Sequence, residues 1–101
     1  MGKILQINMK YSAPIDQLAK AFMELAQPIA DVSGLKWKVW LHNGEEKTCG
    51  GIYLFEDDAS VQGYLDSEIV AGIGTNPALS DVSIKVFDVL PDHSKITRAP
   101  L

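Results

Sequence analysis

Apolar residues in this chain recur with two different spacings, and the order of these spacings restricts the fold more than any other feature. Strand-like patterns of alternating side chains occur at 3–9, 35–42, 48–55 and 82–89. Spacings of three and four residues, typical of an amphipathic helix, follow the first strand and the third. The sequence therefore predicts the order strand, helix, strand, strand, helix, strand.

Both predicted helices contain residues that disturb helical structure. Pro28 is expected to end or kink the first helix, because proline cannot donate the backbone hydrogen bond of a helix interior. Asp57 or Asp58 can cap the second helix, and Gly63 weakens it by about 1 kcal/mol relative to alanine. The glycine-containing stretch 72–77 is expected to end that helix.

The order of elements predicts one α+β domain over residues 1–101, with a core at 1–90 and a tail without regular period at 91–101. Asn43-Gly44 marks a hairpin between the second and third strands. Two right-handed crossovers then give the ferredoxin-like βαββαβ fold, a four-stranded antiparallel sheet with two helices on one face.

Apolar side chains are predicted on both faces of this sheet. In the third strand, Ile52 and Leu54 point away from the face that carries Tyr53 and Phe55. Helices on one face leave the other uncovered, and a monomer rarely exposes an apolar patch beyond a few hundred Å². We therefore expect a homodimer whose two sheets pack face to face, with Trp40, Ile52 and Leu54 in the interface.

Composition excludes several classes of partner. A net charge of −4 and a pI near 4.9 argue against nucleic acid, whose binding depends on clustered basic residues. No apolar run approaches the roughly 20 residues that cross a bilayer, and the first ten residues lack the apolar core of a secretory signal. The lone Cys49 can form no internal disulfide, and the few Cys and His residues predict no metal site, so we expect a cytoplasmic protein.

Four segments, read in order and spacing, resemble one known family: Trp37-Lys38-Val39-Trp40, Gly50-Gly51-Ile52-Tyr53-Leu54-Phe55, Tyr64-Leu65 and Lys85-Val86-Phe87-Asp88-Val89. They are similar to the YdhR-type monooxygenases, a branch of the dimeric α/β-barrel superfamily. The likeness covers nearly the whole chain. It implies a homodimer with a pocket between each sheet and its helices, and an oxygenase chemistry that uses no cofactor, neither metal nor flavin.

Oxygenation without a cofactor requires an apolar pocket, hydrogen-bond donors for a phenolate or enolate, and a base that removes the substrate proton. His42 is the only histidine in a predicted regular element, and histidine titrates nearest to neutral pH, so His42 is the candidate base. Tyr53 is the candidate stabiliser of the oxyanion. A solvated histidine and a backbone-bonded tyrosine are the structural alternatives.

Three further residues are candidates for substrate binding. Trp37 shares a predicted face with Leu35, so its indole either fills the core or lines a pocket as a donor. Asn8 can donate to a substrate carbonyl or satisfy backbone near the strand end. Tyr64 lies on the inner face of the second predicted helix, where core packing is the alternative.

The sequence thus predicts a cofactor-independent monooxygenase acting on a small aromatic molecule, such as a polycyclic phenol or hydroquinone. A dimer that binds a small molecule without turnover, as a regulatory module, is the alternative. Haem degradation, the chemistry of a sister branch, ranks last because it needs a helical histidine that ligates iron, and neither predicted helix contains a histidine.

Overall fold

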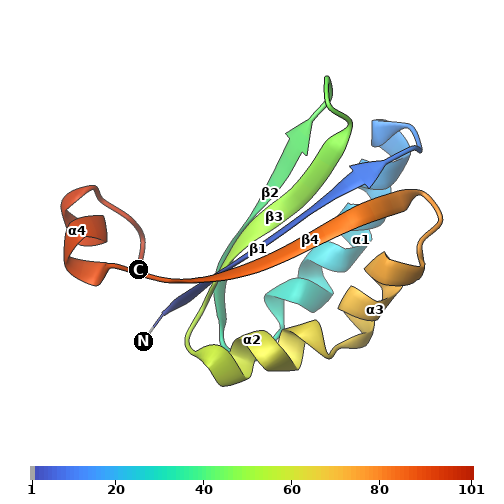
Figure 1. Cartoon of the computed structure of the whole chain (residues 1–101). Coiled ribbons are helices and arrows are strands. Elements are labelled where there is room, and N and C mark those ends of the chain that lie inside the picture. Colours follow the sequence, from blue (N-terminus) through green and yellow to red (C-terminus); the bar gives the residue numbers. More distant parts are fainter. Residues whose placement is uncertain (1) are drawn as a thin grey trace.

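The chain forms four strands and four helices in a computed structural model that describes residues 2–101 (Figure 1). Their bounds are β1 (Lys3–Tyr11), α1 (Ile15–Ala30), β2 (Leu35–Asn43), β3 (Thr48–Phe55), α2 (Asp58–Leu65), α3 (Glu68–Thr75), β4 (Leu79–Asp88) and α4 (Pro91–Ile96). The strands form one antiparallel sheet in the order β2-β3-β1-β4. This arrangement is the predicted ferredoxin-like fold.

The helices α1, α2 and α3 lie on one face of the sheet, and α4 stands apart beyond the end of β4 (Figure 1). Alternate residues of β1 point toward those three helices and are buried: Leu5, Ile7, Met9 and Tyr11. In β3 the buried partners on this face are Cys49, Tyr53 and Phe55. The main core therefore lies between the sheet and its helices, as the two spacings of the sequence predict.

An extra residue in β2 determines which of its side chains face the helices. Leu35 pairs with Phe55 and Trp37 pairs with Leu54, so β2 advances two residues where β3 advances one. This bulge at Lys36 puts Leu35 and Trp37 on opposite faces. The prediction that Leu35 and Trp37 share a face is therefore wrong, because strict alternation does not allow for a bulge.

The second predicted helix is two helices in the structure, α2 and α3. Asp57 caps α2, and its carboxylate accepts a hydrogen bond from the Ser60 backbone N–H at 2.9 Å. The stretch 72–77 ends the helix as predicted, although Gly72 and Gly74 themselves lie inside α3. The helix ends at Thr75, one residue before Asn76, whose extended backbone is the conformation favoured ahead of Pro77.

Pro28 also lies inside a helix, because α1 continues to Ala30 before the chain turns. The helix therefore continues for two residues past Pro28 instead of ending there.

The segment 91–101, predicted as a tail without regular period, contains the six-residue helix α4. Such a helix is too short to show a periodic apolar pattern, and Pro91 occupies its first turn, where proline is tolerated. After α4 the chain returns to the sheet. The Trp37 indole N–H donates to the Pro100 carbonyl at 2.7 Å, and Leu54 is only 1% exposed on the sheet face without α1–α3.

Candidate functional site

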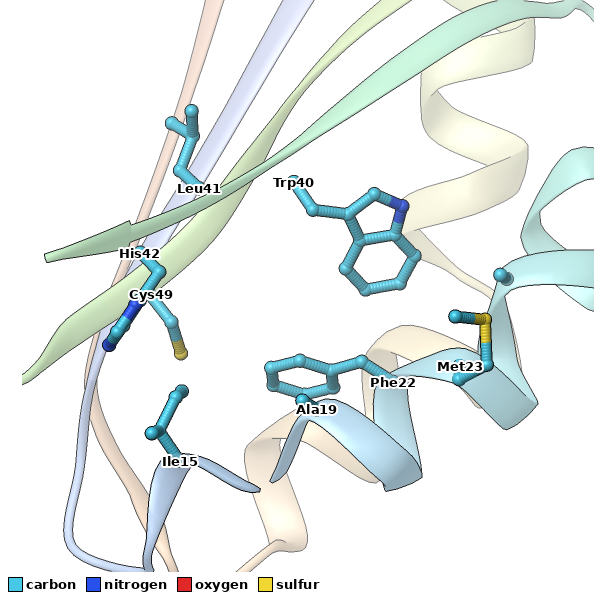
Figure 2. Close-up of a pocket in the computed structure, with 9 residues that line it drawn as sticks. Ile15, Ala19, Phe22, Met23, Trp40, Leu41, His42 and Cys49 are labelled. Atoms are coloured by element: carbon cyan, nitrogen blue, oxygen red, sulfur yellow. The ribbon is translucent and has the colours of Figure 1, made fainter. Parts of the chain in front are cut away.

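A cavity of about 280 Å³ lies between α1 and the β2–β3 end of the sheet. Its lining is mostly apolar: Ile15, Ala19, Phe22, Met23, Ala26, Trp40, Leu41, His42 and Cys49. Figure 2 shows Phe22 reaching from α1 toward the sheet and Trp40 reaching from β2 toward α1, whereas Leu41 points to the other side of β2. An amphipathic helix over a sheet edge thus leaves room for a small, flat apolar molecule.

Trp40 is the aromatic side chain of β2 that faces the helices. Its ring centroid lies 5.6 Å from that of Phe22, and it pairs with Gly51 in the same row as the buried Ile7. The side chain remains 39% exposed because α1 covers the edge strand incompletely. The sequence predicted Trp40 as a contact of the sheet-to-sheet interface, which is wrong because its indole lies on the face that carries the helices.

His42 lines the same cavity and is held by a neighbouring side chain. The His42 Nε2 atom lies 2.9 Å from the Tyr11 hydroxyl, and the two rings are 5.8 Å apart. Cys49 pairs directly with His42 across the strands and is 3% exposed. Burial raises the pKa of the Cys49 thiol, which keeps it protonated, so His42 is the polar group available for proton transfer.

Tyr53 and Tyr64 form a separate, closed pair deeper in the protein. Their hydroxyl oxygens are 2.8 Å apart, and each side chain is 1% exposed. Burial raises the pKa of both phenols above the ordinary tyrosine value, so both stay neutral. Each hydroxyl therefore has a partner already, and the structure does not bring Tyr53 or Tyr64 together with His42.

The remaining predicted residues lie on the opposite face of the sheet. Asn8 pairs with Gly50 and Ser83, in the row beside the buried side chains of β1. Trp37 is tied to the tail, and Leu54 is covered within the same chain, whereas Ile52 is half-buried. None of these four side chains lines the 280 Å³ cavity.

Lys38 is a site residue that sequence reasoning missed. Its ammonium lies 3.3 Å from the centroid of the Trp40 ring and 4.5 Å from that of Tyr53. Burial lowers the pKa of Lys38 to about 7. The sequence feature that could have indicated Lys38 is Gly51 on the adjacent strand, because a Cβ at Gly51 would lie 2.5 Å from Lys38 Cε.

The space around Trp40 continues beyond the main cavity. Trp40 and Lys38 both line a second cavity of about 190 Å³ near the start of β2, and a small one of about 30 Å³ that also touches Tyr53. The Trp40 ring therefore separates the His42 side of the cleft from the Lys38 side.

Within residues 2–101, no three histidine, cysteine or acidic side chains come together in a way that would hold a metal ion. In the same part of the chain, no helix has the length and apolar character needed to cross a bilayer.

The family model described as "Putative mono-oxygenase ydhR" matches residues 4–100. This chain belongs to that family. The match spans every strand and helix that lines the cleft around Trp40, so the YdhR-type assignment rests on the whole domain. Among curated proteins, no sequence matches this YdhR-type chain significantly.

Solved structures similar to this YdhR-type protein include two whose function is unknown and one oxygenase. NE2512 from Nitrosomonas europaea has 24% identity and a TM-score of 0.71, with 89% of this chain and 91% of its own covered. SnoaB from Streptomyces nogalater, a cofactor-independent oxygenase, has 12% identity and a TM-score of 0.70, with 88% and 93% covered. A dimeric ferredoxin-like protein from Jannaschia sp. CCS1 has 14% identity and a TM-score of 0.68, with 88% and 100% covered.

Proposed function

We propose that this protein is a cofactor-independent monooxygenase that oxidises an aromatic substrate in the cavity between α1 and β2. The observation that carries the proposal is a histidine, His42, oriented by Tyr11 in the wall of an otherwise apolar cavity of about 280 Å³. Membership of the YdhR-type monooxygenases and the fold shared with SnoaB support it.

His42 would act as the base. When Nε2–H donates to the Tyr11 hydroxyl, the other ring nitrogen, Nδ1, carries a lone pair that accepts a proton from the substrate. The positive imidazolium formed in this way keeps its hydrogen bond to the Tyr11 oxygen. Phe22 and Trp40 would hold the flat rings of the substrate and exclude water from one side.

The proposed reaction needs oxygen as its only co-substrate. An anthrone-type substrate loses a proton from its CH₂ group to His42, and the resulting carbanion transfers one electron to O₂. The substrate radical and superoxide then combine to a peroxide anion, which takes the proton back from His42 and becomes a hydroperoxide. Loss of water from the peroxide leaves a C=O group, so one oxygen atom enters the product and the other leaves as water.

The test is oxygen uptake by protein treated with a chelator, over a panel of anthrones and hydroquinones. We expect saturable uptake without added metal or flavin, and a fall of 10²-fold or more in kcat for His42→Ala, the range typical of a lost general base. His93→Ala is the matched control, because His93 lies in α4, away from the cleft (Figure 1).

Tyr11→Phe is the second variant, and it should lower kcat less than His42→Ala because it only releases the ring. No uptake with any panel compound, together with tight binding of one of them, would support the alternative of a binding module without turnover. Uptake that needs added haem or flavin would contradict the proposal.

We also propose that two copies pair through the sheet face that lacks α1–α3. Val39 is 51% exposed on this face and Phe87 is 46% exposed, with the half-buried Ile52 between their strands. The dimeric Jannaschia protein of the same fold supports this pairing. Leu54 needs no partner copy, since the chain already covers it.

Sedimentation analysis tests this pairing. A charge at the centre of a buried apolar interface should dissociate the dimer, so Val39→Asp is expected to sediment as a monomer. Met23→Asp is the control, because Met23 is 76% exposed on α1, and this variant should remain dimeric. A wild-type chain that is still monomeric at a protein concentration 100-fold above the detection limit would contradict the pairing.

A further inference from the structure

Lys38 is placed differently from an ordinary surface lysine. Its neighbour on the strand, Lys36, is exposed, whereas Lys38 turns inward, and its ammonium rests on the faces of Trp40 and Tyr53. The missing side chain of Gly51 provides the space for this inward path, because a Cβ there would meet Lys38 Cε at 2.5 Å. The fold therefore accommodates a charge in the cleft.

Nothing among the described residues neutralises that charge. Within residues 2–101, the Lys38 ammonium makes no salt bridge and no hydrogen bond. α1 and α3 present only apolar side chains to the cavities that it lines: Phe22, Leu25, Ala26, Ile29, Ala30, Ile69 and Ile73. The titratable neighbours are Tyr53 and Cys49, which burial keeps neutral, and Lys36, whose positive charge cannot neutralise that of Lys38.

The two aromatic faces attract the ammonium but carry no negative charge that would neutralise it. A half-buried cation with no counter-ion lowers stability relative to an apolar side chain of similar length. An apolar side chain would fill this space without that loss of stability. A ligand with a negative charge would offset the loss, because it would pair with the buried ammonium.

We propose that Lys38 binds the negative charge of the ligand, so that the cleft takes an aromatic anion rather than a neutral aromatic molecule. The fused rings would lie in the main cavity beside Trp40 and Phe22. The carboxylate or phenolate would reach past the edge of the Trp40 ring to Lys38, through the small cavity that Phe22, Trp40 and Lys38 all line. This inference rests on the proposed function for its aromatic ligand and adds the charge that the ligand must carry.

Titration gives an independent readout. Since burial lowers the pKa of Lys38 to about 7, part of the population is neutral at pH 8. A bound anion favours the ammonium, so binding must take up a proton in that range. At pH 5.5 Lys38 already carries its proton, and uptake should vanish.

The experiment compares naphthalene-2-carboxylate with its neutral isostere naphthalene-2-carboxamide, under nitrogen, by quenching of tryptophan fluorescence at pH 6. We expect the carboxylate to bind at least tenfold more tightly to the wild-type protein. Lys38→Met should abolish this preference, and Lys38→Arg should retain it. Lys20→Met, which removes an exposed charge from α1 and touches none of the cavities around Trp40, is the control and should bind like the wild type.

Calorimetry in two buffers of different ionisation enthalpy measures the proton uptake. We expect the wild type to take up a substantial fraction of one proton at pH 8 and none at pH 5.5. Lys38→Arg should take up none at either pH, because arginine keeps its charge. Equal affinity for the two naphthalenes, binding of neither at 1 mM, or a preference that survives in Lys38→Met would overturn the proposal.

The two proposals fail separately. Lys38-dependent binding of the carboxylate without oxygen uptake on any panel compound would remove the oxygenase and keep the anion site. Turnover of a neutral hydroquinone that Lys38→Met leaves unchanged would keep the oxygenase and remove the anion site.

Discussion

The interface between sheet and helices has two ends with opposite character. At the tyrosine end, formed by Leu5, Tyr53, Phe55, Val61 and Tyr64, every side chain is at most 1% exposed. At the histidine end, formed by Phe22, Trp40, His42 and Cys49, α1 stands off the edge strand, leaving a cavity of about 280 Å³. Both ends lie on the same face of the sheet and use similar aromatic residues, so aromatic content alone does not separate a core from a site.

Polar groups distinguish the two ends. At the tyrosine end, the two hydroxyl groups form a hydrogen bond with each other at 2.8 Å, and the packing leaves no room for a ligand. At the histidine end, His42 faces open space, and Lys38 lies at the border between the ends without a counter-ion. A closed polar pair indicates stability, whereas polar groups that converge on an apolar cavity indicate chemistry.

The largest expected effect compares two phenylalanines. Phe55→Ala should lower the free energy of unfolding by about 3–5 kcal/mol, because it leaves a cavity in a fully packed core. Phe22→Ala should cost less than half of that, since its site is already partly open. Urea denaturation of both variants measures the difference, and equal losses would show that the two ends are packed alike.

The tyrosine pair gives the next largest effect. Tyr53→Phe leaves the Tyr64 hydroxyl buried without a partner, so we expect a loss of about 1–3 kcal/mol. The double variant with Tyr64→Phe should lose less than the sum of the single losses, because no hydroxyl is then left unsatisfied. Additive losses would show that the hydroxyls do not depend on each other.

The same single variant addresses the sequence prediction that Tyr53 is catalytic. If Tyr53→Phe keeps its fold but loses oxygen uptake, the tyrosine end takes part in the chemistry and the separation of the two ends fails.

The strands and their order were predictable because period-two patterns and the Asn43-Gly44 turn depend only on local sequence. Residues 48–55 match β3 at both bounds. The break between α2 and α3 was not visible, because Asp66 and Ser67 interrupt the helix without glycine or proline. Helical propensity does not exclude these residues, and tertiary packing decided the outcome.

The site was harder to predict than the fold. A single bulge at Lys36 exchanged the expected environments of Trp37 and Trp40, because one extra residue reverses the face of everything beyond it. His42 was singled out because it is the only histidine in a predicted regular element, and it lines the cavity. Lys38 was missed because a lysine on an edge strand usually points to solvent, and its inward path depends on Gly51 across the sheet.

A smaller effect is expected from pH, at the border of the two ends. The pKa of Lys38 is near 7 in the folded chain and near 10.5 when it is unfolded, so the unfolded chain binds more protons between these values. Stability therefore rises with pH above 7, by less than the about 1.4 kcal/mol per pH unit that one whole proton gives. The usable window is pH 7–8.5, because the raised pKa values of Cys49 and the two tyrosines act in the opposite direction above about pH 9.

Urea denaturation of wild type and Lys38→Met at several pH values within this window measures that rise as a difference. The difference in stability, wild type minus variant, should increase with pH. A flat difference would mean that Lys38 is solvated and belongs to neither end.

The smallest expected effect is a gain of stability at the tyrosine end. Gly63 lies inside α2, and a Cβ added there would meet nothing within 4 Å. Gly63→Ala should therefore raise the free energy of unfolding by about 0.5–1 kcal/mol through helix propensity alone. Thermal and urea denaturation measure the gain, and Gly72→Ala, equally open in α3, is the matched substitution.

These glycine variants also show how far the two ends are coupled. If α2 only supports the core, Gly63→Ala should leave the affinity for naphthalene-2-carboxylate unchanged within twofold, because its stabilisation acts on a helix that does not line the 280 Å³ cavity. A stabilised variant that binds more weakly would mean that the histidine end needs movement of the tyrosine end to admit its ligand. The closed and open ends would then work as one unit rather than as a core beside a site.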